Sequence, residues 1–304
     1  MATRVSTVAI LGLGLIGGSL ARALKANAFC ERVIGYGHRA PSLEKGVALG
    51  VIDSFTLDLD EVIESADILV ICTPTLIAEQ VLEQILPRIA GRQDAPVVTD
   101  AASVKGNLES AARRICDGRY PANFVLGHPI AGSEQSGVAA SKADLYVNHR
   151  VIITPVAEND AAALDLVRDM WAATGAEVVD MSVAQHDAVL AATSHLPHVL
   201  AYSLVDALAQ SDASDEIFRC AAGGFRDFTR IASSDPVMWR DIAIANKGAL
   251  LDSIDLFSEH LASLRAAVEA QDSDGMHATF TRAKAARDEF AAILAERQGD
   301  KAES

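Results

Sequence analysis

Short apolar runs alternate with amphipathic stretches along the first part of the chain, and this alternation predicts strands separated by helices. The amphipathic stretches Leu76–Ile89 and Val104–Ile115 have the three- and four-residue spacing of helices. Strands that are apolar throughout are typical of a mainly parallel sheet with helices on both faces. The predicted strands are Val8–Leu11, Val33–Tyr36, Ile68–Cys72, Val97–Thr99, Phe124–Leu126, Arg150–Thr154 and Glu177–Val179.

From about Val183 onward the pattern is helical throughout. One apolar stripe recurs at three and four residues, and it consists of Ile254, Phe257, Leu261, Leu264 and Val268. The stripe belongs either to an intramolecular core or to a dimer interface, because so long a helical segment needs an apolar partner. The length favours two domains. We predict an α/β domain over residues 1–182 and an all-helical dimerisation and substrate domain over residues 183–304.

The most specific motif follows the first predicted strand. Gly12, Gly14 and Gly17 have the spacing of the dinucleotide-binding fingerprint. The first glycine permits a tight turn, the second lets the backbone approach a pyrophosphate, and the third lets the helix pack closely on the strand. Unpaired N–H groups at the start of that helix, at Leu15 and Ile16, would favour phosphate. The sequence therefore predicts a Rossmann-like dinucleotide-binding domain.

The end of the second predicted strand bears on the choice of dinucleotide. An NAD site usually carries an acidic residue there, which holds the ribose 2′-hydroxyl. This segment reads Gly35-Tyr-Gly-His-Arg39, with no carboxylate. His38 and Arg39 either face a 2′-phosphate or are solvated turn residues, and we expect NAD(P) with a preference for NADP. Thr73 and Pro74 follow another strand, where ligands of such sheets bind, so we assign them to the cofactor site.

Composition narrows the classes of function. The formal net charge is −15, which argues against a nucleic-acid surface because such binding depends on neutralising phosphates. No run reaches the roughly 18 uninterrupted apolar residues of a membrane span. The 4 cysteines are scattered without a C-x-x-C pair, which fits buried thiols in a reducing cytoplasm. A secretory signal is the competing interpretation of the N-terminus, but cleavage after Ala23 would remove all three glycines of the motif.

Three polar clusters are candidates for a substrate site. His128 opens the run His128–Glu134 at the end of a predicted strand, and a histidine titrates near neutrality, as general acid–base catalysis requires. A purely structural histidine is the alternative. His195 and His198 share a face at the start of a predicted helix, but no third ligand with suitable spacing accompanies them, so we expect no metal. Gly223–Arg230 contains arginines, whose planar guanidinium groups can bind a carboxylate through two hydrogen bonds.

Taken together, these clusters resemble the prephenate/arogenate dehydrogenase family of tyrosine biosynthesis. The resemblance runs from Val8 to about Arg265. It rests on the glycine motif, Asp100–Gly106, His128–Glu134, Ser194–His198, and Asp227–Arg230 with Trp239. It implies a Rossmann-like domain followed by a helical dimerisation domain. It also implies oxidative decarboxylation of a cyclohexadienol, in which a hydride passes to the nicotinamide and the ring carboxylate leaves as CO₂.

The resemblance further implies a role for each matching residue. His128 would deprotonate the ring hydroxyl, and Ser103 would contact that hydroxyl and the nicotinamide end of the cofactor. His198 would contact the substrate, and Arg230 would bind a substrate carboxylate. The positions that line or gate the pocket would be Glu134, Asp227 and Trp239. For His195, substrate binding and a structural role stay open.

The substrate also stays open, because the family includes enzymes for prephenate, for arogenate and for both. NAD-preferring members carry an acid where this chain has Gly37, which again points to NADP. Two other functions compete: a 3-hydroxyacid or 6-phosphogluconate-type dehydrogenase, which relies on a helix-borne lysine, and a non-catalytic dinucleotide sensor. We expect a cytoplasmic homodimer joined through its C-terminal helices, with a small-molecule substrate and neither nucleic acid nor membrane as a partner.

Overall fold

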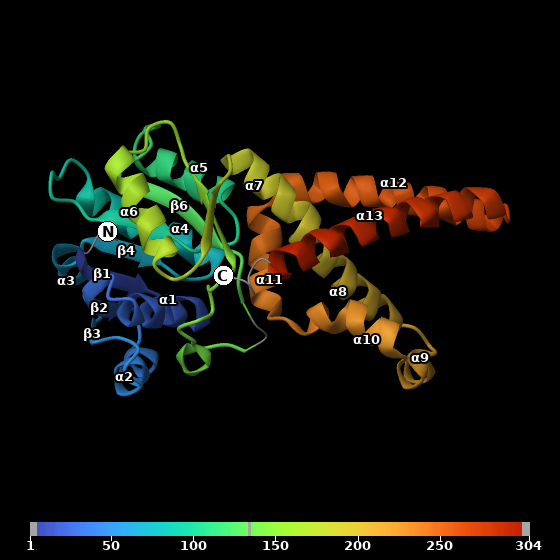
Figure 1. The fold of residues 1–304 in the computed structure, drawn as a ribbon, viewed down its shortest axis with the longest axis horizontal. Helices are drawn as coiled ribbons and strands as arrows, with labels where there is room; N and C mark the ends of the chain where they lie inside the picture. Colours follow the sequence, from blue (N-terminus) through green and yellow to red (C-terminus); the bar gives the residue numbers. More distant parts are fainter. Residues whose placement is uncertain (1–4, 133–134, 300–304) are drawn as a thin grey trace. The chain divides into compact units, whose positions relative to one another are not determined.

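The computed structural model describes residues 5–132 and 135–299, with side chains up to residue 295. The chain divides into two compact units, Met1–Leu250 and Leu251–Ser304. The first unit contains the sheet and the helices that surround it, and the described part of the second consists of helices joined by a short turn at residues 270–272 (Figure 1).

An eight-stranded sheet forms the centre of the first unit, in the order β3-β2-β1-β4-β5-β6-β7-β8. All neighbouring strands are parallel except β6 and β7, which pair antiparallel with Leu126 opposite Thr154. The seven predicted strands are confirmed, and β3 is an addition at the edge. The strands are β1 (Val5–Leu11), β2 (Cys30–Tyr36), β3 (Ser54–Thr56), β4 (Ile68–Ile71), β5 (Val97–Asp100), β6 (Phe124–Pro129), β7 (Arg150–Thr154) and β8 (Glu177–Asp180).

The central strands are apolar throughout because helices cover both faces of the sheet. Val8 and Ile10 of β1 face one side, where they join the cluster that contains Leu20 of the first helix. Ala9 and Leu11 face the other side, in a cluster with side chains of the helices that follow β3, β4 and β5. The side chains of these four consecutive residues, Val8 to Leu11, are all buried. Figure 1 shows this layered arrangement, and the predicted doubly covered parallel sheet is confirmed.

Helices connect most of the strands, and further helices follow β8. Those within the sheet region are α1 (Leu15–Ala26), α2 (Ala40–Ala48), α3 (Leu59–Ser65), α4 (Thr75–Ile89), α5 (Gly106–Ile115), the 3₁₀ turn η1 (Val138–Ala140) and α6 (Ala161–Ala172). Those after β8 are α7 (Val183–Leu190), the π-helical turn η2 (Ala191–His195), α8 (Leu196–Ala209), α9 (Ser214–Cys220), α10 (Gly223–Thr229), the 3₁₀ turn η3 (Arg230–Ser233), α11 (Pro236–Ala245), α12 (Lys247–Glu269) and α13 (Ser273–Gly299).

The segment Ser194–His198 lies inside a continuous helical run, not at a helix start as the sequence suggested. The run comprises α7, η2 and α8, and Pro197 is accommodated in the first turn of α8. By length and composition alone, Val183–Ala209 is apolar enough to cross a membrane, with a mean hydropathy of 1.3. A helix in the interior of a globular protein meets the same criterion. In this run, 22% of the most apolar window is buried within the described residues. His186 and Asp187 of α7 bond to His128 of β6 and to the start of α5, and these bonds tie the first part of the run to the sheet region.

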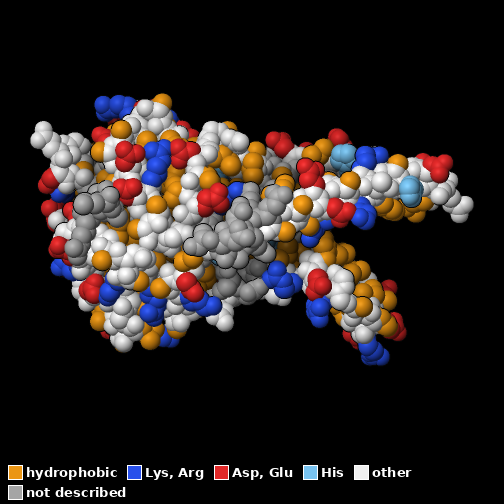
Figure 2. All heavy atoms as spheres, in the orientation of Figure 1, with side chains coloured by type: hydrophobic (Ala, Val, Ile, Leu, Met, Phe, Trp, Pro, Cys, Tyr) orange, Lys and Arg blue, Asp and Glu red, His pale blue; other side chains and the backbone are white. Residues whose placement is uncertain are grey.

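Apolar side chains remain at the surface of several helices. In α12, Phe257 is 36% exposed and Leu261 is 53% exposed. Figure 2 shows hydrophobic side chains at the surface along α12 and α13. Val268 of the stripe is also exposed, and Ile254 and Leu264 are half-buried.

Candidate active site

Four chain segments meet at the carboxyl edge of the sheet, where strands β1, β4, β5 and β6 end. The chain order of the strands reverses between β1 and β4, and parallel sheets bind their ligands at such a switch point. Gly12 follows β1 and Thr73 follows β4, so both flank this point. Ser103 follows β5, and His128 is the penultimate residue of β6. The predicted residues from these four segments therefore lie along one edge.

The three glycines of the motif have different surroundings. A Cβ on Gly12, whose φ is +102°, would lie 2.8 Å from the carbonyl oxygen of Cys72. A Cβ on Gly17 would lie 2.5 Å from the carbonyl oxygen of Gly12, so α1 packs against the turn. A Cβ on Gly14 would have no atom within 4 Å. Since packing explains the first and third glycines but not the second, the open space at Gly14 is where a ligand would approach.

The first turn of α1 offers free backbone donors. Gly14 is its N-cap, and α1 has neither a capping side chain nor an acidic residue in its first turn. The N-terminus of such a helix attracts phosphate. The helix is fixed in place by Tyr146, whose hydroxyl donates to the carbonyl of Ile16 over 2.6 Å. The loop thus fits a dinucleotide pyrophosphate.

His38 and Arg39 follow the end of β2, and both are exposed. Nε of Arg39 donates to Nε2 of His38 over 3.1 Å. The nearby acid Asp53 is engaged elsewhere, because it accepts hydrogen bonds from Lys25 and from the backbone N–H of Val33. The described residues at this strand end therefore include a cation and an imidazole but no free carboxylate from Asp53.

A buried ion pair joins β5 to β6. Lys105 is fully buried, and it donates to the Asp100 carboxylate and, over 2.6 Å, to the carbonyl of Gly127. Asp100 also accepts from the N–H groups of Ala102 and Gly127. The pair thus fastens the loop that carries Ser103 to the strand that carries His128.

His128 is buried and hydrogen-bonded to a second histidine. Its Nδ1 lies 2.8 Å from Nε2 of His186 in α7, and Nδ1 of His186 lies 2.8 Å from Oδ1 of Asp187. Burial lowers the pKa of His128 well below its ordinary value, and the neighbouring His186, Lys105 and His195 lower it further. His128 is therefore neutral at pH 7 and able to accept a proton.

A second group of aromatic side chains lies on η2, α8 and α11. The ring of Trp239 stacks on His198, with centroids 3.4 Å apart, and meets His195 edge-on at 6.2 Å. Burial lowers the pKa of His195 to about 4. The predicted shared face of the two histidines is confirmed. Within the described part of the chain, His195 Nε2 and Trp239 Nε1 are buried without a hydrogen-bond partner.

Asn246 determines the proton position on His195. Its amide nitrogen donates to the carbonyl of Asp187 over 2.8 Å and lies 3.1 Å from Nδ1 of His195. Nδ1 of His195 therefore accepts, and Nε2 carries the hydrogen of the neutral ring. This leaves two buried N–H donors, on His195 and Trp239, for an acceptor on a ligand.

The arginine segment lies beside this group. Arg230 begins η3 and is exposed, and its charge lowers the pKa of His198, although burial has the larger effect. Asp227 is exposed and pairs with the neighbouring Arg226 over 3.1 Å. Glu134 lies outside the described residues, so its predicted place in the pocket has no structural counterpart here.

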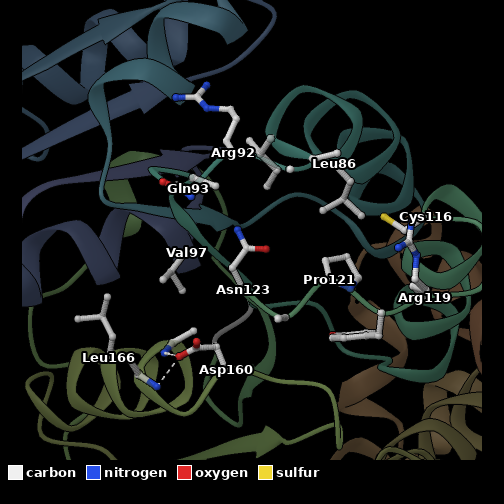
Figure 3. Close-up of a pocket in the computed structure, with 18 residues that line it drawn as sticks. Leu86, Arg92, Gln93, Val97, Cys116, Arg119, Pro121, Asn123, Asp160 and Leu166 are labelled. Carbon is white, nitrogen blue, oxygen red and sulfur yellow. Dashed lines mark hydrogen bonds between the residues drawn. The ribbon is translucent and has the colours of Figure 1, made fainter.

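A cavity of about 670 Å³ lies elsewhere, at the amino ends of β5 and β6 (Figure 3). Three polar side chains of its lining bond to the protein: Asn123 donates to the carbonyl of Pro96, Asp160 caps α6, and Arg92 pairs with Glu64. The buried hydroxyl of Tyr120, also in the lining, has no hydrogen-bond partner among the described residues. None of the predicted site residues lines this cavity. The predicted residues Ser103 and His128 instead follow or end strands at the opposite, carboxyl edge of the sheet.

Sequence reasoning missed His186, Asp187 and Asn246. The available signal was the pair His186-Asp187 inside an otherwise apolar helical run, since such a run keeps polar residues only where they find partners. The pairing with His128, 58 residues away in the chain, could not be read from that pattern.

Family models describe most of this chain. The nucleotide-binding domain of prephenate dehydrogenase matches residues 20–180, and the dimerization domain of prephenate dehydrogenase matches residues 182–282. The chain belongs to the prephenate dehydrogenase family. The resemblance inferred from the sequence motifs is thereby confirmed, and the protein is an oxidoreductase of this family.

Similar proteins cover nearly the whole chain. The prephenate dehydrogenase of Bacillus subtilis is 38% identical over 286 residues, which is 93% of this chain and 75% of the relative. The cyclohexadienyl dehydrogenase of Zymomonas mobilis is 36% identical over 282 residues, 92% of this chain and 94% of the relative. The crystal structure of the Aquifex aeolicus prephenate dehydrogenase, in complex with hydroxyphenyl propionate and NAD⁺, has a TM-score of 0.86 and 36% identity, covering 94% of this chain and 98% of that one.

Proposed function

We propose that this prephenate dehydrogenase family member catalyses the NAD(P)-dependent oxidative decarboxylation of prephenate, of arogenate or of both. The observation that carries the proposal is the position of a buried, neutral histidine on the same sheet edge as the glycine loop. A hydroxyacid dehydrogenase would need a lysine at the reacting centre. Here the buried Lys105 is held by Asp100 and by the carbonyl of Gly127, which disfavours that alternative.

The cofactor would bind at the glycine loop, with Gly12, Gly14, Leu15, Ile16 and Gly17 around the pyrophosphate. The open space at Gly14 and the uncapped start of α1 support this assignment. Thr73 and Pro74 would line the same site, and the buried hydroxyl of Thr73 has no partner among the described residues. When bound, the nicotinamide supplies the hydride acceptor. NAD⁺ is the cofactor in the A. aeolicus complex, and His38 with Arg39 supports a preference for NADP.

His128 would take the proton of the ring hydroxyl. As the O–H bond breaks, electron density on the oxygen favours departure of the hydride from the same ring carbon. Loss of the ring carboxylate as CO₂ then makes the ring aromatic. Ser103 would contact the same hydroxyl and orient it. A general base of this kind accelerates turnover by roughly 10²–10⁴-fold.

The carboxylates of the substrate would meet the group around Trp239. Arg230 supplies the cation, and the N–H donors of His195 and Trp239 lack other partners within the described chain. An acidic protein needs such a local concentration of donors to bind an anionic substrate. His198 would contact the substrate from its stack on Trp239, and Asp227 and Glu134 would line or gate the pocket.

The domain division at residues 182 and 183 also remains a proposal. The strands end with β8 at Asp180, which supports it. The match to a dimerization domain and the exposed apolar side chains of α12 support a homodimer through the C-terminal helices. The cysteines are scattered without a C-x-x-C pair, which supports a cytoplasmic location.

Replacement of the base tests the mechanism. In His128→Asn we expect NAD(P) affinity to stay unchanged while kcat with prephenate or arogenate falls by roughly 10²–10⁴-fold, because the proton acceptor is removed. His149→Asn is the matched control, since His149 is an exposed loop residue. Steady-state kinetics and fluorescence titration of the cofactor provide the two readouts. Wild-type turnover in His128→Asn would remove this residue from its role.

A further inference from the structure

Three side chains form a continuous hydrogen-bonded chain that ends at His128. Nδ1 of His128 lies 2.8 Å from Nε2 of His186, and Nδ1 of His186 lies 2.8 Å from Oδ1 of Asp187. Asp187 is anchored in turn by α5, because Oδ1 accepts from the N–H of Lys105 over 2.9 Å and Oδ2 accepts from the N–H of Gly106 over 2.8 Å. The chain thus connects the start of one helix to the candidate base.

The anchored carboxylate determines which nitrogens carry hydrogen. Burial alone would raise the pKa of Asp187, but bonds from His186 and the two backbone N–H groups hold it below its ordinary value, so Asp187 is ionised. A carboxylate only accepts, so Nδ1 of His186 must donate to it. Nε2 of neutral His186 is then an acceptor and takes its hydrogen bond from Nδ1 of His128. Nε2 of His128 is left without a hydrogen.

We propose that His186 and Asp187 are positioning residues that hold His128 in the tautomer whose Nε2 is the proton acceptor, and that they stabilise its charge after it accepts the proton. This rests on the proposed function of His128. The substrate O–H bond breaks and an N–H bond forms at Nε2 of His128. The positive charge is then shared across the His128–His186 hydrogen bond and balanced by Asp187. The proton returns to the phenol oxygen when the ring becomes aromatic.

The other charged groups around His128 do not serve this purpose. Lys105 disfavours a second positive charge on His128 and on His186. Asp100 is the partner of Lys105, and His195 is neutral. Of the groups that act on the two histidines, Asp187 is the carboxylate left to compensate an imidazolium.

Variants of His186 distinguish a role in setting the tautomer of His128 from a role in packing alone. In His186→Gln the amide oxygen still accepts from Nδ1 of His128, while in His186→Leu nothing does. We expect kcat to fall by roughly 10²-fold in His186→Leu and by about 10-fold in His186→Gln, within the range that a general base contributes, with little change in KM or in cofactor affinity. Equal losses in two variants of equal thermal stability would contradict a role in setting the tautomer.

Variants of Asp187 test the charge. In Asp187→Asn the amide nitrogen must face at least one N–H donor, and loss of the charge makes protonated His128 less stable. We expect a kcat lower by roughly 10–10³-fold, together with a shift of the acid limb of the kcat–pH profile to lower pH. Asp160→Asn is the matched control: Asp160 also accepts from two backbone N–H groups at a helix start, but contacts no histidine. We expect it to lower thermal stability while kcat and the pH profile stay unchanged. An unshifted acid limb in Asp187→Asn would overturn the proposal.

A measurement without turnover keeps this proposal distinct from the proposed function. Nitrogen-15 NMR of histidine-labelled wild-type protein reports the tautomer of each ring. We expect a hydrogen on Nδ1 of both His128 and His186, and loss of that pattern in Asp187→Asn. A hydrogen on Nε2 of His128 in the wild-type protein would contradict the tautomer even if the dehydrogenase activity is present. An inactive wild-type protein with the expected tautomers would instead count against the proposed function.

Discussion

Arg230 is the residue that we propose binds a carboxylate of the substrate. It lies beside His198, whose pKa it lowers, and it is not buried within the described chain. We expect Arg230→Ala to raise KM while kcat changes little, because a charge-assisted hydrogen bond contributes about 1.5–3 kcal/mol to binding. Arg219→Ala removes the same charge from α9 and should leave KM unchanged. An unchanged KM in Arg230→Ala with lower thermal stability would instead indicate a structural ion pair.

The position of a single residue was predictable where it follows from an apolar strand, as for His128 near the end of β6. His186 and Asp187 were not, because their meaning depends on a partner 58 residues away. Lys105 was part of a recognised motif, but its fully buried pairing with Asp100 follows only from the way β5 and β6 pack together. Local sequence indicates which side chains are chemically reactive, whereas the fold determines which of them are in contact.

In the strand–turn–helix element formed by β1 and α1, different glycines serve packing and ligand binding. Gly17→Ala would force a Cβ to within 2.5 Å of the Gly12 carbonyl oxygen and 2.6 Å of Ile10 Cγ2. We expect it to destabilise the protein by about 1–3 kcal/mol. Gly14→Ala meets no protein atom within 4 Å, so its stability should stay within about 1 kcal/mol of wild type. Its cofactor affinity should nevertheless fall, because the added methyl occupies the ligand's approach. Thermal unfolding and cofactor titration measure both effects, and unchanged affinity in Gly14→Ala would count against a pyrophosphate at this loop.

Elements with long apolar runs were predictable to within a few residues, since both faces of a central strand are buried. The edge strand β3 was not, because Ser54–Thr56 has three residues and only one apolar side chain. The π-helical turn η2 also escaped prediction. Its backbone is displaced from regular helix spacing beside Asn246, whose amide binds both the Asp187 carbonyl and His195. Such a tertiary contact leaves no periodic signal.

At the scale of the whole molecule, the exposed apolar residues of α12 are the basis for the proposed dimer interface. We expect the protein to be a homodimer in analytical ultracentrifugation, and Leu261→Asp to favour the monomer because it places a charge on the stripe. Ser263→Asp adds the same charge on a different face of α12 and should leave the dimer intact. A wild-type monomer at micromolar concentration would contradict the proposed interface.

The domain order was predictable because the change from alternating to purely helical pattern is a property of long segments. The substrate was not, since prephenate and arogenate differ in one side-chain group and one sequence does not reveal which residue discriminates between them. The predicted preference for NADP depends on two residues, His38 and Arg39, whose side chains bond to each other in this structure.

The most direct test of the central claim is an assay of prephenate and arogenate, each with NAD and with NADP. It measures the reduced cofactor and the released CO₂ together. We expect at least one of the four combinations to yield one CO₂ for each reduced nicotinamide, with NADP at least as effective as NAD. Cofactor reduction without CO₂, or no reduction in any combination by a protein that still binds the cofactor, would contradict oxidative decarboxylation as the function of this chain.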